Sequence, residues 1–140
     1  MSFDRRFDAR WEHVIAPAIR DLRRGGTPLE PFRVDLSKAS DAILTEILVQ
    51  IADSHAIIAD ITAIAEVDGR PARNANVLYE VGLAHAARLH EEVILFRSDK
   101  SALDFDIAGV RVHEYQPDDD PAAARAFVSE TVVASLAALD

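Results

Sequence analysis

The sequence predicts an α/β domain in which helices cover both faces of a doubly wound parallel sheet. Short apolar runs, such as residues 56–59, are typical of strands that are buried on both faces. Between them lie longer stretches with apolar residues at helical spacing. The links are short, and strands that alternate with helices across short links form parallel sheets with right-handed crossovers. We expect the 140 residues to form a single domain, 1–140.

The first predicted element is a helix over residues 10–24. Apolar side chains recur in it at helical spacing, and Gly25 and Gly26 stop the run. Pro17 lies inside this stretch and cannot donate a backbone hydrogen bond. We therefore expect either a kink or a separate first segment near Pro17.

A turn over residues 25–31 leads to the next two elements. Residues 32–36 alternate between apolar and polar, which predicts a half-covered or edge strand. A second helix follows, with isoleucines and leucines on one face, and ends near Asp53. Residues 55–61 then form a strand that we expect to be buried on both faces.

The second half of the chain repeats this alternation. Residues 62–73 lack periodicity and predict a surface loop at the carboxyl end of a strand. A third helix over 74–89, capped by Asn74 or Asn76, leads to a buried strand over 92–96. After a loop over 97–109, the last elements are a strand at 110–115 and a helix beyond the Pro117 to Pro121 turn. The inner face of that helix carries Phe127, Val128, Val132, Leu136 and Leu139.

The beginning of the chain departs from this scheme. A doubly wound sheet normally opens with a buried strand, whereas this sequence opens with a polar octet that leads into a helix. We therefore expect that the first strand is missing or truncated, or that the sheet is a reduced, four-stranded one.

Composition excludes several classes of function. Twenty-four acidic and 15 basic residues give a net charge of −9 at pH 7, which disfavours nucleic acid polymers as partners. The absence of cysteine excludes disulfides, thiolate zinc sites and cysteine nucleophiles. The five histidines show no metal-ligand spacing, so we expect no metal site. No apolar run approaches a membrane span and no secretory signal is present, so we expect a cytoplasmic protein without a membrane partner.

The helix over 74–89 carries the main candidate for catalysis, Glu80. Helical spacing places Glu80 on one face with Asn76, near the helix start and beside the apolar Val77 and Val81. Burial there raises the pKa of a carboxylate, while the helix amino end and the asparagine amides favour the anion. Such a carboxylate serves as a nucleophile or stabilises a sugar cation.

The alternative is that Glu80 is an ordinary solvated helix residue. Small side chains in the same helix favour the functional interpretation, because they indicate a helix pressed closely against its neighbours. They are Gly82, Ala84, Ala86 and Ala87.

Further candidates lie at the carboxyl ends of two strands, where doubly wound sheets bind ligands. Asp60 could hydrogen-bond ribose hydroxyls or orient a base, or it could cap the next turn. In the loop over 97–109, Phe105 could stack on a base while Asp104 or Asp106 binds its edge; alternatively, Phe105 fills the core from a one-turn helix. Arg97 is a candidate phosphate ligand or a surface charge.

Several segments resemble one family along nearly the whole chain. The specific one is Asn76-Val-Leu-Tyr-Glu-Val-Gly-Leu-Ala-His-Ala, which resembles the nucleoside 2-deoxyribosyltransferase-like proteins, close in fold to Toll/interleukin-1 receptor (TIR) domains. The weaker matches are Met1-Ser-Phe-Asp, Val14-Ile-Ala-Pro-Ala-Ile, Ile58-Ala-Asp-Ile-Thr and Phe105-Asp-Ile. The resemblance implies a flavodoxin-like fold. That family usually has a hydrophobic strand before the first of these segments, which is the strand that this sequence lacks.

The resemblance also implies a chemistry. It assigns to Glu80 the attack on, or the stabilisation of, C1′ as an N-glycosidic bond breaks, with Asp60 as a second catalytic or pocket residue. The residues that we expect to bind substrate are Asn76, Tyr79, Thr62, Phe3, Arg97, Phe105 and Asp106.

The function expected from sequence is therefore cleavage or transfer of an N-glycosidic bond of a nucleotide. NAD is the first expected substrate and a deoxynucleoside or its monophosphate the second, with no further cofactor and with assembly into a homo-oligomer. TIR enzymes that act on NAD often serve bacterial antiviral defence. The alternative is a catalytically silent nucleotide-sensing or scaffold domain that oligomerises. Neither the base nor the choice among hydrolysis, transfer and cyclisation follows from the sequence.

Overall fold

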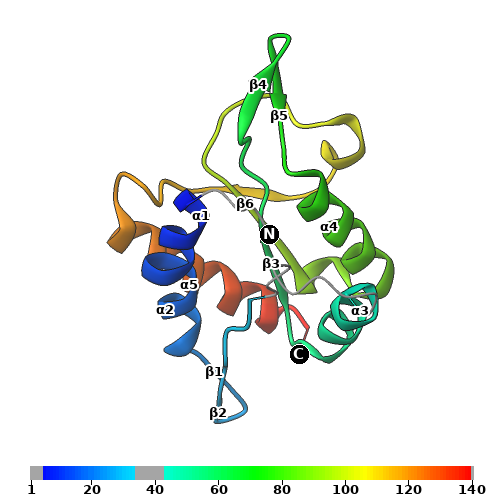
Figure 1. Ribbon diagram of the computed structural model, residues 1–140. Coiled ribbons are helices and arrows are strands. Elements are labelled where there is room, and N and C mark those ends of the chain that lie inside the picture. The colour runs from blue at the N-terminus through cyan, green and yellow to red at the C-terminus, as the bar shows by residue number, and fades with distance from the viewer. Residues whose placement is uncertain (1–4, 34–42, 140) are drawn as a thin grey trace.

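A parallel sheet between two layers of helices forms the centre of the computed structural model, which describes residues 5–33 and 43–139 (Figure 1). Three strands make up this sheet in the order β3 (Ile57–Asp60), β6 (Val93–Arg97) and β7 (Val112–Glu114). Both neighbouring pairs are parallel. The predicted α/β class, with a parallel sheet flanked by helices, is thereby confirmed.

The register of the sheet explains the different burial of its strands. Ile57 lies opposite Val93 and Asp60 opposite Phe96. The central strand β6 is buried from Val93 to Phe96, because it has a strand on each side and helices on each face. By contrast, β3 is only half-buried along its length. The expectation that β3 is a fully buried strand was wrong, because β6 is its only strand partner within the described residues.

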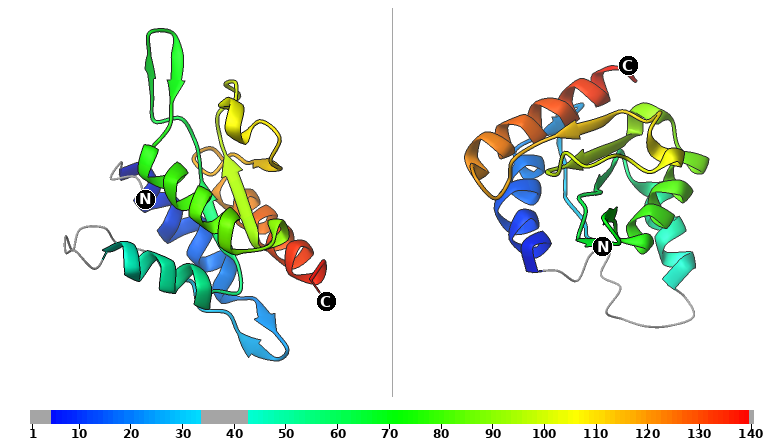
Figure 2. Two further views of the ribbon diagram at one scale, coloured as in Figure 1. Left: turned by 90° about the vertical axis from the view of Figure 1, so that its right-hand side faces the viewer. Right: turned by 90° about the horizontal axis from the view of Figure 1, so that it is seen from above.

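Helices cover the two faces of the sheet in separate groups (Figure 2). One face packs against the amino-terminal helix, residues 5–20, and against α5 (Pro121–Ala137). The other face packs against α3 (Ile43–Asp53) and α4 (Ala75–Ala87). The predicted second, third and last helices are therefore confirmed in position. Among the described residues, none of the helices has the length and apolar character to cross a membrane.

The amino-terminal helix is continuous but irregular. It consists of α1 (Arg5–Arg10), a π-helical turn η1 (Trp11–Ile15) and α2 (Ala16–Arg20). It therefore begins and ends earlier than the predicted range, 10–24. The last residues of that range leave the helix because they form a strand that leads into the Gly25-Gly26 turn.

Pro17 accounts for the irregular turn, which is a π-helical turn in a continuous helix where a kink or a separate first segment was expected. It has no N–H to donate to the carbonyl of His13, and its ring crowds that carbonyl. The helix widens just before Pro17, so that the N–H of Ala16 reaches the carbonyl of Trp11, five residues back. The carbonyl of His13 instead accepts a hydrogen bond from Nη2 of Arg125 in α5, at 3.0 Å.

A short antiparallel hairpin follows, formed by β1 (Arg23–Arg24) and β2 (Thr27–Pro28). Its turn needs φ angles of +56° and +84°, which the glycines at 25 and 26 adopt without strain. The strand predicted over 32–36 is not seen at residues 32 and 33, which have no regular structure, and its remainder lies outside the described residues.

A second hairpin projects from the carboxyl end of β3, at the top of Figure 1. It is formed by β4 (Ala65–Val67) and β5 (Arg70–Ala72). The surface loop predicted over 62–73 therefore does lie at the carboxyl end of β3, but the prediction was wrong in that this segment forms a hairpin. The sequence did contain the signal, since Asp68-Gly69 favours a two-residue hairpin turn, and both residues have positive φ, +51° and +72°.

Short 3₁₀ turns and capping side chains complete the fold. The turns are η2 (His90–Glu92), before β6, and η3 (Phe105–Ile107), which is the one-turn helix considered for Phe105; the side chain of Phe105 lies outside the description. The N-cap of α5 is Asp120, whose carboxylate accepts from the N–H of Ala123 at 3.0 Å. Leu136 is buried as predicted, whereas Phe127 is 37% exposed.

Candidate functional site

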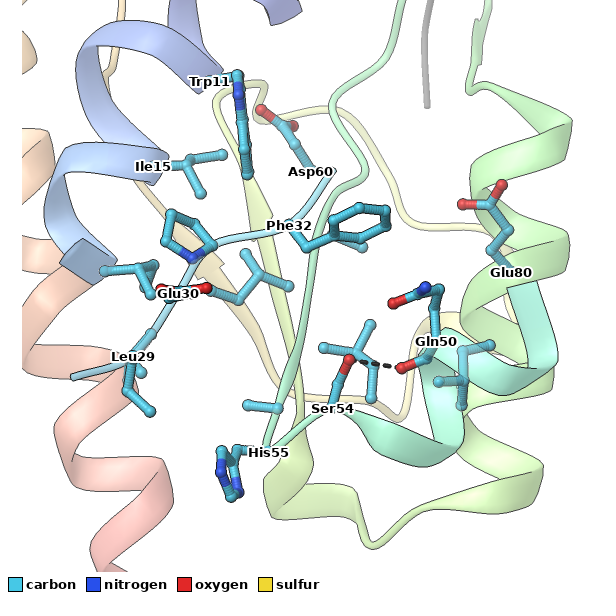
Figure 3. A pocket seen from close by; sticks show the side chains of 18 of the residues that line it. Trp11, Ile15, Leu29, Glu30, Phe32, Gln50, Ser54, His55, Asp60 and Glu80 are labelled. Atoms are coloured by element: carbon cyan, nitrogen blue, oxygen red, sulfur yellow. Dashed lines mark hydrogen bonds between the residues drawn. The ribbon is translucent and has the colours of Figure 1, made fainter. Parts of the chain in front are cut away.

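A cavity of about 690 Å³ lies beside β3, between the two helical layers (Figure 3). Its volume is in the range of small-molecule sites, which is roughly 300–1,000 Å³. The amino-terminal helix, α3, α4, β3 and residues 27–32 all contribute to its walls. Most of the lining is apolar, and the charged side chains among the lining residues include Arg10, Asp60 and Glu80.

Glu80 occupies the wall that α4 contributes. Figure 3 shows its carboxylate on the opposite side of the view from Trp11 and Ile15 of the amino-terminal helix. The residue is half-buried, and burial is the main cause that raises the pKa of its carboxyl above the ordinary value of 4.5. The partly desolvated carboxylate expected from the sequence is thus present beside a cavity.

The expected reason for this burial holds at only one of the four small side chains, Ala84, which is 0% exposed in the cluster that packs α4 against the sheet. Gly82, Ala86 and Ala87 are exposed, and a Cβ on Gly82 would have no heavy atom within 4 Å, so they do not press the helix against its neighbours. Val77 and Val81 instead hold α4 against the sheet, since both are buried in the same hydrophobic cluster as β6. Because Val77 and Val81 are held there, Glu80, on the adjoining side of the helix, lies at the wall of the cavity.

The start of α4 is fixed by Asn74. Its side-chain oxygen accepts hydrogen bonds from the backbone N–H groups of Asn76, at 3.0 Å, and Val77, at 3.3 Å. Asn74 is therefore the N-cap, one of the two asparagines considered for that role. Asn76 and Tyr79 lie on the exposed side of the helix, and Tyr79 is 58% exposed.

Asp60 ends β3 and is the centre of a buried polar network. Nη1 of Arg10 donates to its carboxylate at 2.8 Å, and the hydroxyl of Tyr115 donates to the same oxygen. The other oxygen accepts from the N–H of Thr62, at 2.9 Å, and from its hydroxyl. Asp60 therefore caps the following turn, as one interpretation held, and also forms an ion pair. Both of its oxygens are occupied by donors of the protein itself.

Arg10 is a residue that sequence reasoning missed. Its side chain is 2% exposed, and besides Asp60 it donates to Ser98 Oγ, at 2.8 Å, and to both carboxylate oxygens of Asp118. A signal was available, because Arg10 shares its helix face with the buried Phe7 and Val14, where a charge needs a partner.

This network shifts the protonation equilibria of its members. Burial favours the neutral form of Arg10, but the hydrogen bond to Asp118 and the charge of Asp60 outweigh it and raise the pKa of the guanidinium. Burial, together with the charge of Asp60, also raises the pKa of Tyr115. Arg10 is therefore charged and Tyr115 neutral throughout the physiological range.

A second buried arginine, Arg73, holds the loop after β6. Its guanidinium donates to both carboxylate oxygens of Asp99, at 3.1 and 3.2 Å, and to the carbonyl of Ile61. Burial opposes ionisation of Asp99, but hydrogen bonds from Arg73, from Ser101 and from the N–H of Ala63 outweigh it and hold the pKa of that carboxyl well below its usual value. This pair connects the ends of β3 and β6.

The structure brings Glu80 and Asp60 to one cavity, but not the other predicted site residues that it describes. Thr62 is buried in the Asp60 network, and Asp106 is exposed. Arg97 donates to the carbonyl of Ser101 at 2.7 Å and to Glu114 at 2.8 Å, as a structural side chain does. Phe3 and the side chain of Phe105 lie outside the description. In their place the cavity lining includes three aromatic side chains that sequence reasoning did not select, Phe7, Trp11 and Phe32.

Within residues 5–33 and 43–139, no group of three or more histidine, aspartate or glutamate side chains is arranged to hold a metal ion. No model of a known protein family matches the chain, and a search of curated proteins found no match either.

Proposed function

We propose that this protein is an enzyme that cleaves or transfers the N-glycosidic bond of a nucleotide, with Glu80 as the catalytic carboxylate. NAD is the first substrate to test and a deoxynucleoside or its monophosphate the second. The observation that carries the proposal is the half-buried Glu80 on the wall of a cavity of nucleotide-compatible size. The proposal includes a flavodoxin-like arrangement of the sheet, which the parallel order of β3, β6 and β7 supports.

The chemistry needs a negative charge beside C1′ of the sugar. As the bond between C1′ and the base nitrogen breaks, its electron pair leaves with the base, and C1′ becomes positively charged. In NAD the nitrogen of the nicotinamide ring is already positive, so nicotinamide leaves as a neutral molecule without a proton donor. The Glu80 carboxylate stabilises the cation, and water then adds its oxygen to C1′ and releases a proton to solvent. Attack by a nitrogen of a second base instead of water gives transfer, and that nitrogen releases its proton to solvent. A neutral deoxynucleoside differs from NAD in that its base leaves as an anion, which takes up a proton from solvent.

The remaining cavity residues divide into binding and positioning roles. Trp11 and Phe32 line the cavity and offer aromatic faces on which a base can stack. Asp60 acts in this proposal as a positioning residue, because its carboxylate is already bound by Arg10, Tyr115 and Thr62. Its part is to fix the end of β3 beside the site.

The test compares the parent protein with Glu80→Gln, which keeps the size of the side chain and removes its charge. A matched control is Glu46→Gln, because Glu46 is an exposed glutamate of α3 outside the cavity. Each protein is incubated with NAD and with a panel of nucleosides and nucleotides, and the released base is measured by chromatography. We expect Glu80→Gln to lose at least about 100-fold in rate and the control to retain the parent rate.

The assay should span a wide range of protein concentration, because an oligomer could complete the site. Equal turnover by Glu80→Gln and parent contradicts the proposal. Binding of NAD or of a nucleotide of the panel in a calorimeter, without turnover of any of these compounds at any protein concentration, also contradicts it and supports the silent nucleotide-sensing domain instead.

A further inference from the structure

Arg10, the arginine of the described cavity lining, has no hydrogen-bond donor left for a ligand. A guanidinium carries five N–H groups. In Arg10 these groups make five hydrogen bonds within the protein: Nε and Nη2 to Asp118, Nη1 to Asp60 and Thr62, and Nη2 also to Ser98. A phosphate group could pair with Arg10 only by breaking this buried network.

The other charged side chains of the described lining are acidic. Glu30, Asp53 and Glu80 line the cavity together with the Arg10–Asp60 pair, so four carboxylates stand against one guanidinium, and this part of the lining includes no lysine. The whole chain has a net charge of −9. Residues 1–4, 34–42 and 140, which lie outside the description, hold one lysine and four aspartates. The electrostatic potential in the cavity therefore disfavours phosphate groups and favours a cation.

Two aromatic side chains of the lining also favour a positively charged base. In the view of Figure 3, Trp11 and Phe32 lie between Ile15 of the amino-terminal helix and Glu80 of α4. The face of an aromatic ring attracts a cation, and this attraction adds to the stacking of a flat base. A cationic aromatic base would gain from both interactions.

The groups near Glu80 suit a base that leaves without taking up a proton. A base with a fixed positive charge at the glycosidic nitrogen leaves as a neutral molecule, whereas a neutral base leaves as an anion and benefits from a nearby acid. His55 is the histidine of the described lining, and Figure 3 shows it at the far end of the view from Glu80. It is therefore remote from the carboxylate that would act on the sugar.

We propose that the preferred substrate is a nucleoside that has no phosphate and whose base carries a fixed positive charge at the glycosidic nitrogen, such as an N-ribosylpyridinium. The inference rests on the proposed function and narrows its substrate. NAD has the same cationic base but also carries a pyrophosphate. In the reaction, the electron pair of the bond to C1′ passes to the ring nitrogen, the pyridine leaves uncharged, and water adds its oxygen to C1′ and releases a proton to solvent.

Three compounds with the same leaving group test the role of phosphate: nicotinamide riboside, nicotinamide mononucleotide and NAD. Each is incubated with the parent protein, and the released nicotinamide is measured by chromatography. At low salt we expect kcat/KM for the riboside to exceed the other two values at least about tenfold. High salt should reduce this preference, because it screens the repulsion of phosphate. A preference that came from shape alone would not respond to salt.

A pair of double variants tests whether the acidic lining causes the preference. Glu30→Gln with Asp53→Asn removes two carboxylates from the lining, whereas Glu46→Gln with Glu91→Gln removes two outside it. All four residues are exposed, and thermal unfolding checks that both variants fold. We expect the first pair to lower the preference for riboside over mononucleotide at least about threefold and the control pair to leave it unchanged.

Binding to Glu80→Gln tests the role of the base charge separately from turnover. The probes are nicotinamide riboside, its mononucleotide and the reduced riboside, whose dihydronicotinamide ring has nearly the same size but no charge. In a calorimeter we expect the oxidised riboside to bind at least about fivefold more tightly than the reduced one. It should also bind more tightly than the mononucleotide.

The results distinguish the inference from the proposed function. Turnover of NAD or of the mononucleotide that equals or exceeds that of the riboside overturns the inference and leaves the proposed function in place. Absence of turnover for all three compounds, with the oxidised riboside still bound most tightly, contradicts the enzymatic function and supports the inferred ligand class. Absence of both binding and turnover contradicts both.

Two further results overturn the inference alone. One is equal binding of the oxidised and the reduced riboside, since the charge of the base would then have no effect. The other is a preference over the mononucleotide that does not respond to salt, or that the control pair lowers as much as the lining pair does, since the charges of the cavity would then not be its cause.

Discussion

The guanidinium of Arg10 and the carboxylate of Asp60 meet at 2.8 Å, with only 2% and 7% of their side chains exposed. The pair joins the amino-terminal helix to the end of β3, close to the wall of the cavity. A buried ion pair of this kind costs free energy to desolvate, and the loss of one partner leaves the other charge buried alone. The pair therefore makes the position of the helix dependent on the end of the strand.

Removal of Arg10 should destabilise the protein strongly. Arg10→Met retains the aliphatic stem but leaves Asp60 without its cation, and we expect a loss of about 3–5 kcal/mol in the free energy of unfolding, measured with urea. Tyr115→Phe removes one hydrogen bond to the same carboxylate and should cost less, about 1.5–3 kcal/mol. A smaller loss for Arg10→Met than for Tyr115→Phe would show that the ion pair does not anchor the helix.

The two asparagines at the start of α4 should behave differently. Asn74→Ala removes the N-cap hydrogen bonds and should lower the free energy of unfolding by about 1 kcal/mol. Asn76→Ala changes an exposed side chain and should alter stability by less than about 0.5 kcal/mol. If Asn76 also holds substrate, its variant loses turnover at unchanged stability. Thermal or urea unfolding and the base-release assay, run on the same samples, decide this.

Gly82 is a position where the protein gains stability by a single change. It lies inside α4, and a Cβ there would meet no heavy atom within 4 Å. Gly82→Ala should raise the free energy of unfolding by about 0.5–1 kcal/mol. Gly69→Ala is the contrasting variant, because its φ of +72° strains any other residue, and it should destabilise the β4–β5 hairpin. A loss of stability in Gly82→Ala would mean that a partner packs on this face.

The raised pKa of Glu80 predicts a pH dependence of activity. The ionised carboxylate is the working form, so kcat/KM should fall as the pH drops through a pKa above 4.5. An acid limb at or below 4.5 would contradict the role of a half-buried Glu80.

The same shift has a consequence for stability. Because the pKa is raised in the folded protein, the stabilising contribution of this group is present below the ordinary value and is lost as the pH rises through the raised one. The glutamine in Glu80→Gln stays neutral at every pH. The free energy of unfolding of this variant, minus that of the parent, should therefore be larger at pH 8 than at pH 4. Thermal unfolding at the two pH values measures the difference.

Local patterns predicted most of the elements. The helical period gave α3, α4 and α5, and the apolar runs gave β3 and β6, because each pattern lies within a short stretch of sequence. The end of the first helix was missed because apolar spacing continues to Leu22, although Arg23 already pairs with Pro28. The Gly25-Gly26 turn and the pairing of β1 with β2 set the end of the helix, and the spacing of apolar residues does not indicate such a turn.

The candidate site also has one part that depends on residues close together in the sequence and one part that depends on distant residues. Glu80 could be predicted because the residues that bury it, Val77 and Val81, are its neighbours on one helix. The partners of Asp60 could not, because Arg10 and Tyr115 lie 50 and 55 positions away and meet it only in the folded chain. The sequence indicated that Arg10 needs a partner, but not which one.

The widened turn before Pro17 also constrains how the chain assembles. Arg125 of α5 binds the carbonyl of His13, and Ser129 binds that of Ala18, across 112 and 111 positions of sequence. Such distant pairing is slow to form. During synthesis, residues 5–20 therefore leave the ribosome long before the helix that completes them, and a chain arrested before Pro121 would carry this first helix with an uncovered apolar side.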